Sequence, residues 1–183
     1  MALPTTDHVA RTCKASTLDP RTKQPTPASF EFRLNDDDGW EAYLSVNWLE
    51  FLPCDLDSNE GKVDTLRRYQ LQNPHKLDVI KPTRSNMYAV LPVAAVRAET
   101  VVNGTTALEC EHEPEAEGDP HSGVFPQPGT HDWSNVPDDP VHLAVQQYLF
   151  ESISHIEPGV RKRSIKPNLA AWPSQPDASS CAF

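Results

Sequence analysis

The sequence predicts an α+β protein in which an antiparallel sheet of hairpins has two helices packed on one face. Apolar and polar residues alternate over 29–34 and 41–48, which is typical of half-buried strands. Over 58–73 and 139–155, apolar residues instead recur at helical spacing. The chain has 183 residues, of which 38% are apolar, and this is enough for one domain with its own core.

The first hairpin is expected to join the strands 29–34 and 41–48. Between them, residues 35–39 read NDDDG and belong to types that tolerate left-handed backbone angles in turns. The apolar residues 48–52 follow the second strand and are expected to leave the sheet as a helical turn.

The chain divides into three parts. Residues 1–28 are polar and contain four prolines, which predicts an irregular N-terminal segment of the domain, with a short helical or irregular piece at Asp7–Cys13. The single α+β domain is expected over 29–157. Residues 158–183 are rich in Pro, Ser and Lys, a composition typical of a disordered tail.

Two helices carry recognisable ends. Asp57 or Ser58 is expected to cap the first helix, which ends before Pro74 because proline cannot continue the helical hydrogen-bond ladder. Asp139 is expected to cap the second, with Pro140 in its first turn. These are the helices expected to cover one face of the sheet.

The other strands follow the first helix. Met87–Val96 is the most apolar run and predicts a central strand, although Pro92 removes one backbone donor and favours an edge position or a bulge. Asn103-Gly104 is a strong hairpin turn and is expected to join the strand before it to one over 105–112. The acidic, proline-rich residues 113–140 are expected to form a long loop.

The charge balance excludes nucleic acid as a partner. The chain has 16 basic and 26 acidic residues, a net charge of −10, which repels phosphate backbones. The basic cluster Arg161–Arg163 with Lys166 is interpreted as a solvated part of the tail, and the alternative is an electrostatic tether to an acidic partner. No apolar run reaches the roughly 18 residues that cross a bilayer, and the first residues lack the features of a signal peptide. We therefore expect a cytoplasmic protein without a membrane partner.

Four side chains are candidate metal ligands: Cys110, His112, His121 and His131. Zinc favours nitrogen and sulfur donors in a tetrahedron, and residues two apart on a strand share a face, as Cys110 and His112 do. Their spacing matches no recognised zinc motif, so the alternative is a buried cysteine surrounded by surface histidines. No cofactor is expected, with zinc as the alternative.

His121, Ser122 and Cys13 are the candidate catalytic residues. Ser122 and His121 cannot act as a pair, since adjacent residues in a strand face opposite ways and a nucleophile needs a base within reach. The alternative for both is a structural role in pinning the loop. Cys13 lies near Arg11 and His8, and positive neighbours stabilise a thiolate; its alternative is a packed thiol.

A compact polar and aromatic patch, Asn47, Trp48 and Glu50, is the candidate partner-binding site. The alternative is structural. In that case Trp48 belongs to the core, and Asn47 satisfies the backbone at the end of a strand.

Three strings together resemble one family of small uncharacterised bacterial proteins. They are Asp7–Cys13 (DHVARTC), Leu44–Glu50 (LSVNWLE) and His121–Val124 (HSGV), and the family pattern is D-x-V-x-R-x-C, LSVNWLE and HSG-[IV]. The resemblance covers residues 7 to about 155 and implies a bacterial, cytosolic protein without implying an activity. The acidic insert after His112 and the proline-rich tail depart from the pattern.

The sequence favours a non-catalytic bacterial cytosolic protein that acts by binding another protein. An acidic surface, a long proline-rich loop and a tail suit recognition by a partner that orders them. The resemblance suggests an operon-encoded stress or defence assembly as the setting. The alternative is a small hydrolase, metal-assisted or not, centred on His121.

Overall fold

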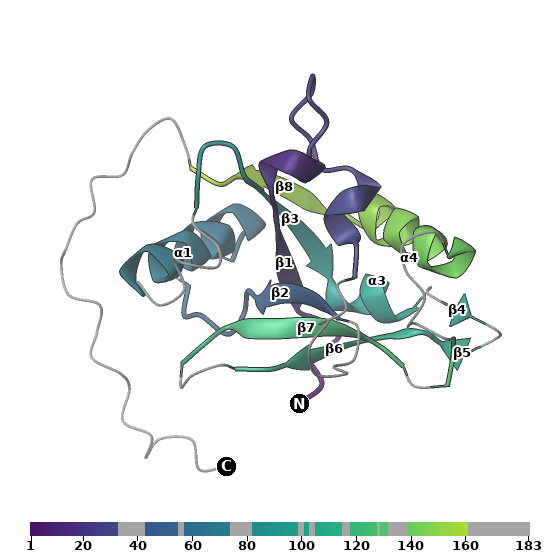
Figure 1. The fold of residues 1–183 in the computed structure, drawn as a ribbon. Coiled ribbons are helices and arrows are strands. Elements are labelled where there is room, and N and C mark those ends of the chain that lie inside the picture. The colour runs from purple at the N-terminus through teal and green to yellow at the C-terminus, as the bar shows by residue number, and fades with distance from the viewer. Residues whose placement is uncertain are drawn as a thin grey trace, which may run out of the picture.

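The computed structural model describes residues 1–32, 43–54, 57–73, 82–98, 101–102, 105–114, 118–127, 129–131 and 139–160. They form a six-stranded antiparallel sheet and a short two-stranded ribbon, with helices on both faces of the large sheet (Figure 1). This confirms the predicted α+β fold class. No helix in these residues is long and apolar enough to cross a membrane.

The large sheet contains six strands: β1 (His8–Cys13), β2 (Leu44–Trp48), β3 (Met87–Pro92), β6 (Leu108–His112), β7 (His121–Pro126) and β8 (His155–Pro158). Their order is β6-β7-β2-β1-β3-β8, and every neighbouring pair runs antiparallel. The ribbon pairs β4 (Val101–Val102) with β5 (Thr105–Thr106). The helices are α1 (Asn59–Gln72), α3 (Val93–Ala98) and α4 (Pro140–Glu151), with the 3-10 helices η1 (Ala15–Thr17) and η2 (Pro27–Phe30).

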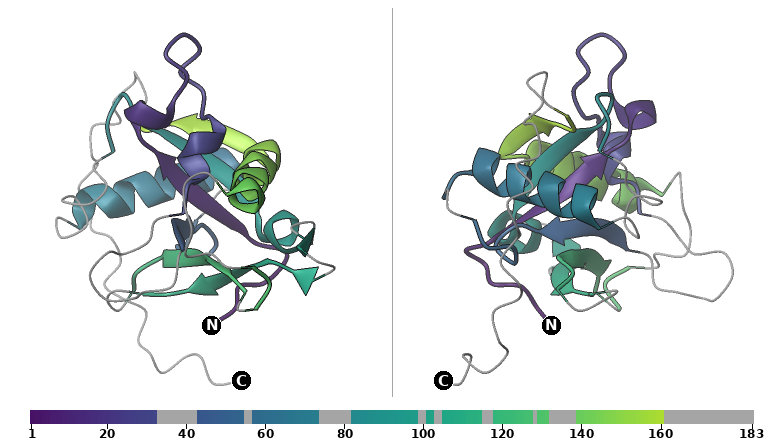
Figure 2. Two further views of the ribbon diagram at one scale, coloured as in Figure 1. Left: turned by 45° about the vertical axis from the view of Figure 1, so that its right-hand side comes forward. Right: turned by 90° about the vertical axis from the view of Figure 1, so that its left-hand side faces the viewer.

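Strand β3 is apolar on both faces and is covered on both. Tyr88 and Val90 belong to the core that includes α1, and Ala89 and Leu91 belong to the core that includes α4. All four are fully buried. The two helices accordingly lie on opposite sides of the sheet (Figures 1 and 2). The expectation that both cover one face is wrong, because a strand with two apolar faces must be shielded from water on each.

Strand β1 occupies the segment Asp7–Cys13, which was expected to be helical or irregular. It pairs with β3 along its whole length and with β2 near its start. Val9 and Ala10 are adjacent yet both fully buried, so this strand also shows no alternation of apolar and polar residues. A central strand covered on both faces lacks the period of two by which half-buried strands are recognised.

Of the alternating residues 29–34, the described part, 29–32, does not form the expected strand, and 33–34 lie outside the described residues. The chain over 27–30 is the 3-10 helix η2, and residues 31–32 have no regular structure. Phe30 and Phe32 are buried in the core that includes α4. The first hairpin is therefore wrong: β2 pairs with β1 and β7 instead. The expected turn over 35–39 lies outside the described residues.

Both predicted helices and their caps are confirmed. The Ser58 hydroxyl accepts a hydrogen bond from the Gly61 amide, 3.2 Å away, at the start of α1. The Asp139 carboxylate accepts from the amides of Val141 and His142, at 2.8 and 3.1 Å, at the start of α4. Helix α4 ends at Glu151, earlier than expected, since the chain then joins the sheet as β8.

Two other expectations change. The segment 113–140, expected to be a long loop, contains strand β7, which its glycine and prolines concealed. The Phe125 ring lies over Gly123, where a Cβ would clash with the ring atoms. The predicted strand Met87–Val96 ends at Pro92 and continues as α3. Ribbon strands β4 and β5 pair across Asn103-Gly104, which is outside the described residues.

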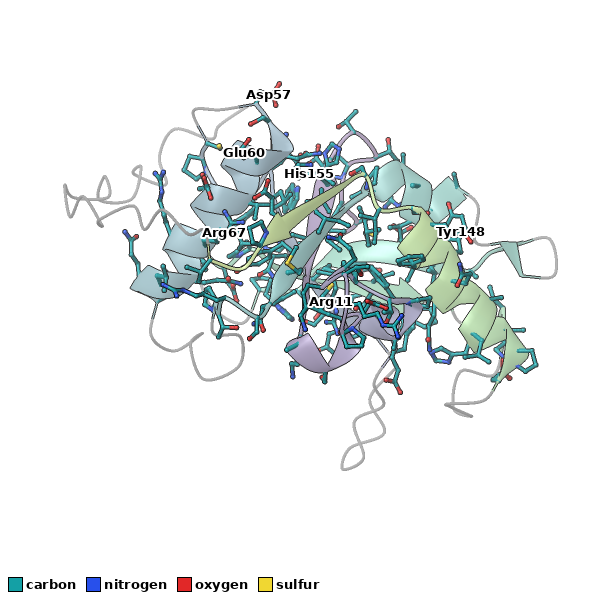
Figure 3. All side chains as sticks on the ribbon, turned by 90° about the horizontal axis from the view of Figure 1, so that it is seen from above. Arg11, Asp57, Glu60, Arg67, Tyr148 and His155 are labelled. Carbon is teal, nitrogen blue, oxygen red and sulfur yellow. The ribbon has the colours of Figure 1, made fainter. Side chains whose placement is uncertain are left out.

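A buried charged network joins α1 to the edge strand β8. Arg67 on α1 is 7% exposed and donates to Asp64, to Glu157 at 3.2 Å and to the Pro158 carbonyl. The His155 imidazole lies 2.9 Å from the other carboxylate oxygen of Glu157. Figure 3 shows Arg67 and His155 where α1 borders β8. Since Pro158 has no amide hydrogen and its carbonyl is occupied, this end of the edge strand resists pairing with another strand.

The opposite edge of the sheet is covered by the first residues of the chain. The Leu3 amide donates to the Cys110 carbonyl at 2.9 Å, and the His112 amide donates to the Met1 carbonyl at 2.8 Å. Leu3 is buried in the core below. The edge strand β6 is thereby partly paired.

Replacing the buried arginine tests the network. Arg67→Met leaves Glu157 buried without its cation, so we expect the free energy of unfolding to fall by about 3 kcal/mol. Arg68→Met, on the exposed face of the same helix, is the matched control and is expected to change it by less than about 0.5 kcal/mol. Urea titration of both variants measures the difference. Equal stability of the two variants would show that the network does not hold α1 to β8.

The histidine of α4 predicts a dependence of stability on pH. His142 is 1% exposed and packs edge-on against Phe32, with ring centroids 5.2 Å apart. Burial lowers the pKa of the imidazole below its ordinary value, and the raising effects of Asp139 and Glu31 do not offset this. Because the folded pKa is the lower one, the stability gained from neutral His142 is present above the unfolded pKa of about 6.5. It is lost as the pH falls from there through the folded pKa.

His142→Leu removes this titration and keeps an apolar side chain of similar size. Thermal unfolding is measured from pH 8 to pH 5. Above pH 7.5, the difference in melting temperature between the variant and the wild type is expected to be constant. Below pH 6.5, the melting temperature of the wild type is expected to fall more steeply than that of the variant, because only the wild type must protonate a buried imidazole. A difference independent of pH over the whole range would contradict the assignment.

Candidate functional site

Four neighbouring strands end at the same side of the sheet. The register places Asn47 opposite His121, Trp48 opposite Val9 and His112 opposite Ser122. After β2 the chain leaves the sheet in a turn, as predicted, and the turn carries Glu50 and Phe51. Ten residues at this side form the strand-end site: Asp7, His8, Asn47, Trp48, Glu50, Phe51, Lys62, His112, Asp119 and His121.

The strand-end site brings together residues that the sequence assigned to different roles. The predicted partner-binding residues Asn47, Trp48 and Glu50 lie beside His112 and His121, which were predicted as metal or catalytic residues. The three strings that carry the family resemblance are strands β1, β2 and β7 with their ends, and these strands are adjacent in the sheet. Their separation in the sequence hides this proximity.

Three rings form an aromatic cluster at the site: Trp48, Phe51 and His112. Their centroids are 5.5 Å apart for Trp48 and Phe51, 5.3 Å for Trp48 and His112, and 4.6 Å for Phe51 and His112. All three side chains are partly exposed. Because every ring touches both others, the cluster encloses no space between its rings and offers its outer surface for contact.

Hydrogen bonds hold the rings of the aromatic cluster in place. The Trp48 indole donates to the Asp7 carboxylate at 2.8 Å, and its amide donates to the Pro120 carbonyl at 2.8 Å. The His112 Nε2 lies 2.7 Å from the Asp119 carbonyl oxygen, which can only accept. Nε2 of His112 therefore carries the hydrogen, and Nδ1 has the lone pair when the ring is neutral.

Glu50 connects β1 to α1 through a second set of contacts. One carboxylate oxygen accepts from the His8 amide at 2.8 Å, and the other lies 3.0 Å from His8 Nδ1 and 3.0 Å from Lys62 Nζ. Lys62 also pairs with Asp57 at 3.2 Å. Burial lowers the pKa of Lys62, but the hydrogen bonds and charges of Glu50 and Asp57 outweigh it and leave the pKa above its ordinary value.

The contact with Glu50 determines which ring nitrogen of His8 carries the hydrogen. The carboxylate only accepts, so Nδ1 of His8 donates to Glu50, and Nε2 is the nitrogen that can take a proton. Within the described part of the chain, Nε2 of His8 has no hydrogen-bond partner. The imidazole is 25% exposed, so it is within reach of solvent.

Two of the candidate catalytic residues, His121 and Ser122, are not brought together. Ser122 is fully buried, and its hydroxyl donates to the Pro120 carbonyl at 3.2 Å. The His121 ring lies on the other face of β7, edge-on to Tyr43 with centroids 6.5 Å apart, and its amide donates to Asp119 at 3.1 Å. These contacts match the structural alternative, in which the two residues pin the chain at the start of β7.

The four predicted metal ligands do not converge either: His112 and His121 lie in the strand-end site, but Cys110 and His131 do not. Cys110 is fully buried in the core, and burial, together with the nearby Glu109, raises the pKa of its thiol to about 12. His131 lies 3.0 Å from Asp139 at the start of α4. Over the described ranges, no three side chains of His, Cys, Asp or Glu are grouped so that they could hold a metal ion.

Cys13 lies at the far end of β1 from the strand-end site and is 1% exposed. Burial raises the pKa of its thiol, and the opposing effects of Ser29 and Arg11 are smaller. This is the reverse of the low pKa expected for a nucleophile, because the charged thiolate is disfavoured in the core. The packed-thiol alternative describes Cys13.

The sequence pattern does not identify Asp7, His8, Phe51 and Lys62 as site residues. Asp7 and His8 open the string at the start of β1, but that strand was not recognised, so nothing linked them to Trp48 and Glu50. Lys62 lies inside the segment 58–73, for which the sequence predicts a helix and nothing further. Its contact with Glu50 depends on how α1 packs on the sheet.

The two buried thiols predict slow alkylation. With raised pKa values and almost no exposure, Cys13 and Cys110 are expected to remain unmodified by iodoacetamide at pH 8 under native conditions. Cys54, which is partly exposed, serves as the internal reference and is expected to react faster by at least about tenfold. Peptide mass spectrometry measures each site, and denaturation in guanidinium should make all three equally reactive. Rapid native alkylation of Cys13 would restore it as a nucleophile.

Comparison with known proteins adds no assignment to this geometry. Family models, curated proteins and solved structures were compared with the chain, and none of them matches it. The geometry of the strand-end site is therefore the available evidence on function.

Proposed function

We propose that the protein acts by binding another protein and that the partly exposed side chains of the strand-end site are its contact surface. Asn47 and Asp119 of this site are buried and support it from below. The observation that carries this proposal is the aromatic cluster of Trp48, Phe51 and His112, partly exposed where four strands end. Tryptophan and other aromatic side chains contribute a large share of binding energy in protein interfaces, because each buries much area with few rotatable bonds.

The support around these rings favours a binding surface. Trp48 is held by the Asp7 carboxylate and by a backbone hydrogen bond to β7, and His112 is held by the Asp119 carbonyl. Side chains already fixed in place lose little entropy when a partner covers them. The cluster is thus prepared for contact before the partner arrives.

Binding is favoured over the alternative of a hydrolase centred on His121. That hydrolase needs a nucleophile within reach of a base, and the Ser122 hydroxyl is buried and engaged elsewhere. The bacterial, cytosolic setting and a place in an operon-encoded stress or defence assembly belong to the same proposal. They rest on the resemblance of the three strings alone.

Truncating one ring tests the contact surface. Phe51→Ala removes a ring of the aromatic cluster, and we expect the affinity for the partner to fall at least about tenfold, or 1.4 kcal/mol. Leu143→Ala, at an apolar residue of α4 that is 48% exposed, is the matched control and is expected to bind as wild type does. The partner is first captured from a lysate of the native host, and the affinities are then measured by calorimetry with the purified partner.

Thermal unfolding must show that both variants are folded at the temperature of measurement. If Phe51→Ala destabilises the domain, Phe51→Leu replaces it, since leucine keeps the volume and removes the ring. A partner that binds wild type and the Phe51 variants equally would contradict the proposal, and so would the absence of any captured protein.

A further inference from the structure

The strand-end site carries more negative charge than its own cations neutralise. Asp7 is partly buried and accepts from two neutral donors, the Trp48 indole at 2.8 Å and the Thr6 hydroxyl at 2.9 Å. Among the described residues, no Lys, Arg or His side chain lies within ion-pair distance of the Asp7 carboxylate. Its charge is therefore held in place but not paired.

The neighbouring carboxylates share a single ammonium group. Lys62 contacts both Glu50 at 3.0 Å and Asp57 at 3.2 Å. Asp57 is 99% exposed at the start of α1, where Figure 3 shows it projecting outward. Lys62 thus serves two carboxylates, while Asp7 has no cation of its own among the described residues, and the chain as a whole carries a net charge of −10.

Trp48 links this surplus charge to the aromatic cluster. Its indole hydrogen points to the Asp7 carboxylate, so the carboxylate lies at the edge of an aromatic ring that is itself partly exposed. A cation placed over the face of tryptophan is attracted by the ring, and a carboxylate at the edge of the ring adds to that attraction. The two groups together provide a place for a positively charged side chain.

We infer that the partner places an arginine side chain over the Trp48 ring and beside the Asp7 carboxylate, which leaves the hydrogen bond between these two residues intact. Arginine fits better than lysine, because its planar guanidinium can stack on the indole while its N–H groups bond to the carboxylate. This inference rests on the proposed function and names the chemistry of the partner: a segment of protein that bears arginine.

A short peptide tests the inference without the natural partner. The probe is the acetylated, amidated peptide Ala-Arg-Ala-Arg-Ala, and the control peptide has citrulline, a neutral analogue of the same shape, in place of arginine. Titration of the full chain at 150 mM salt is followed by the NMR signal of the Trp48 indole hydrogen. We expect the arginine peptide to shift this signal and to bind at least about tenfold more tightly than the citrulline peptide.

Two variants with the same change in charge separate the site from general attraction. Asp7→Asn keeps an oxygen that can accept from Trp48, so the ring stays in place, and we expect the affinity for the arginine peptide to fall at least about fivefold. Glu151→Gln, on an exposed residue of α4, is the matched control and is expected to change it by less than twofold. Equal losses in both variants would overturn the inference, as would equal binding of the two peptides.

The outcome is distinguishable from failure of the proposed function. If Phe51→Ala weakens binding of the natural partner while Asp7→Asn leaves its affinity unchanged, the contact surface is supported and the inference of an arginine ligand is overturned. If both substitutions weaken the natural partner and Glu151→Gln does not, both the surface and its arginine ligand are supported.

Discussion

The burial of strand β3 on both faces is the constraint from which the rest of the structure follows. Four consecutive apolar residues, Tyr88–Leu91, cannot be covered by a single layer, so α1 packs on one face and α4 on the other. The neighbouring strand β1 is then also covered on both sides, which accounts for the adjacent buried residues Val9 and Ala10. The conformational cost of ordering the chain is met mainly by this three-layer burial.

The same arrangement of strands determines the position of the strand-end site. Antiparallel pairing in the order β6-β7-β2-β1 brings the end of β2 beside the starts of β1 and β7 and the end of β6. Polar and charged side chains lie at this side of the sheet. Among them, Glu50 and Lys62 form an ion pair that connects the sheet to α1. Further along the sheet the polar residues are structural, as in the network of Arg67 and Glu157 between α1 and β8.

The histidines and cysteines show why residue type alone is a poor guide to function. Cys13 and Cys110 are core residues whose thiols burial keeps protonated. His121 and Ser122 are adjacent in sequence and therefore lie on opposite faces of β7. The side chains that do converge are the aromatic cluster and the Asp7 carboxylate, which has no cationic partner among the described residues, and we propose that they bind another protein.

The sequence by itself determined those elements that are specified by neighbouring residues, namely the two capped helices and strand β2. The caps Ser58 and Asp139 and the helical spacing that follows them fixed α1 and α4, because a cap satisfies amides within one turn. The alternation over 41–48 located β2, and the partly exposed Trp48 and Glu50 of the predicted patch lie in the strand-end site, whereas Asn47 is buried there. Tertiary structure alone decided the pairing of strands, the identity of β1 and β7, and the convergence of Asp7, His8 and Lys62 on that patch. The reason is physical: strands buried on both faces show no alternation, and contacts between distant segments depend on the packing of the whole core.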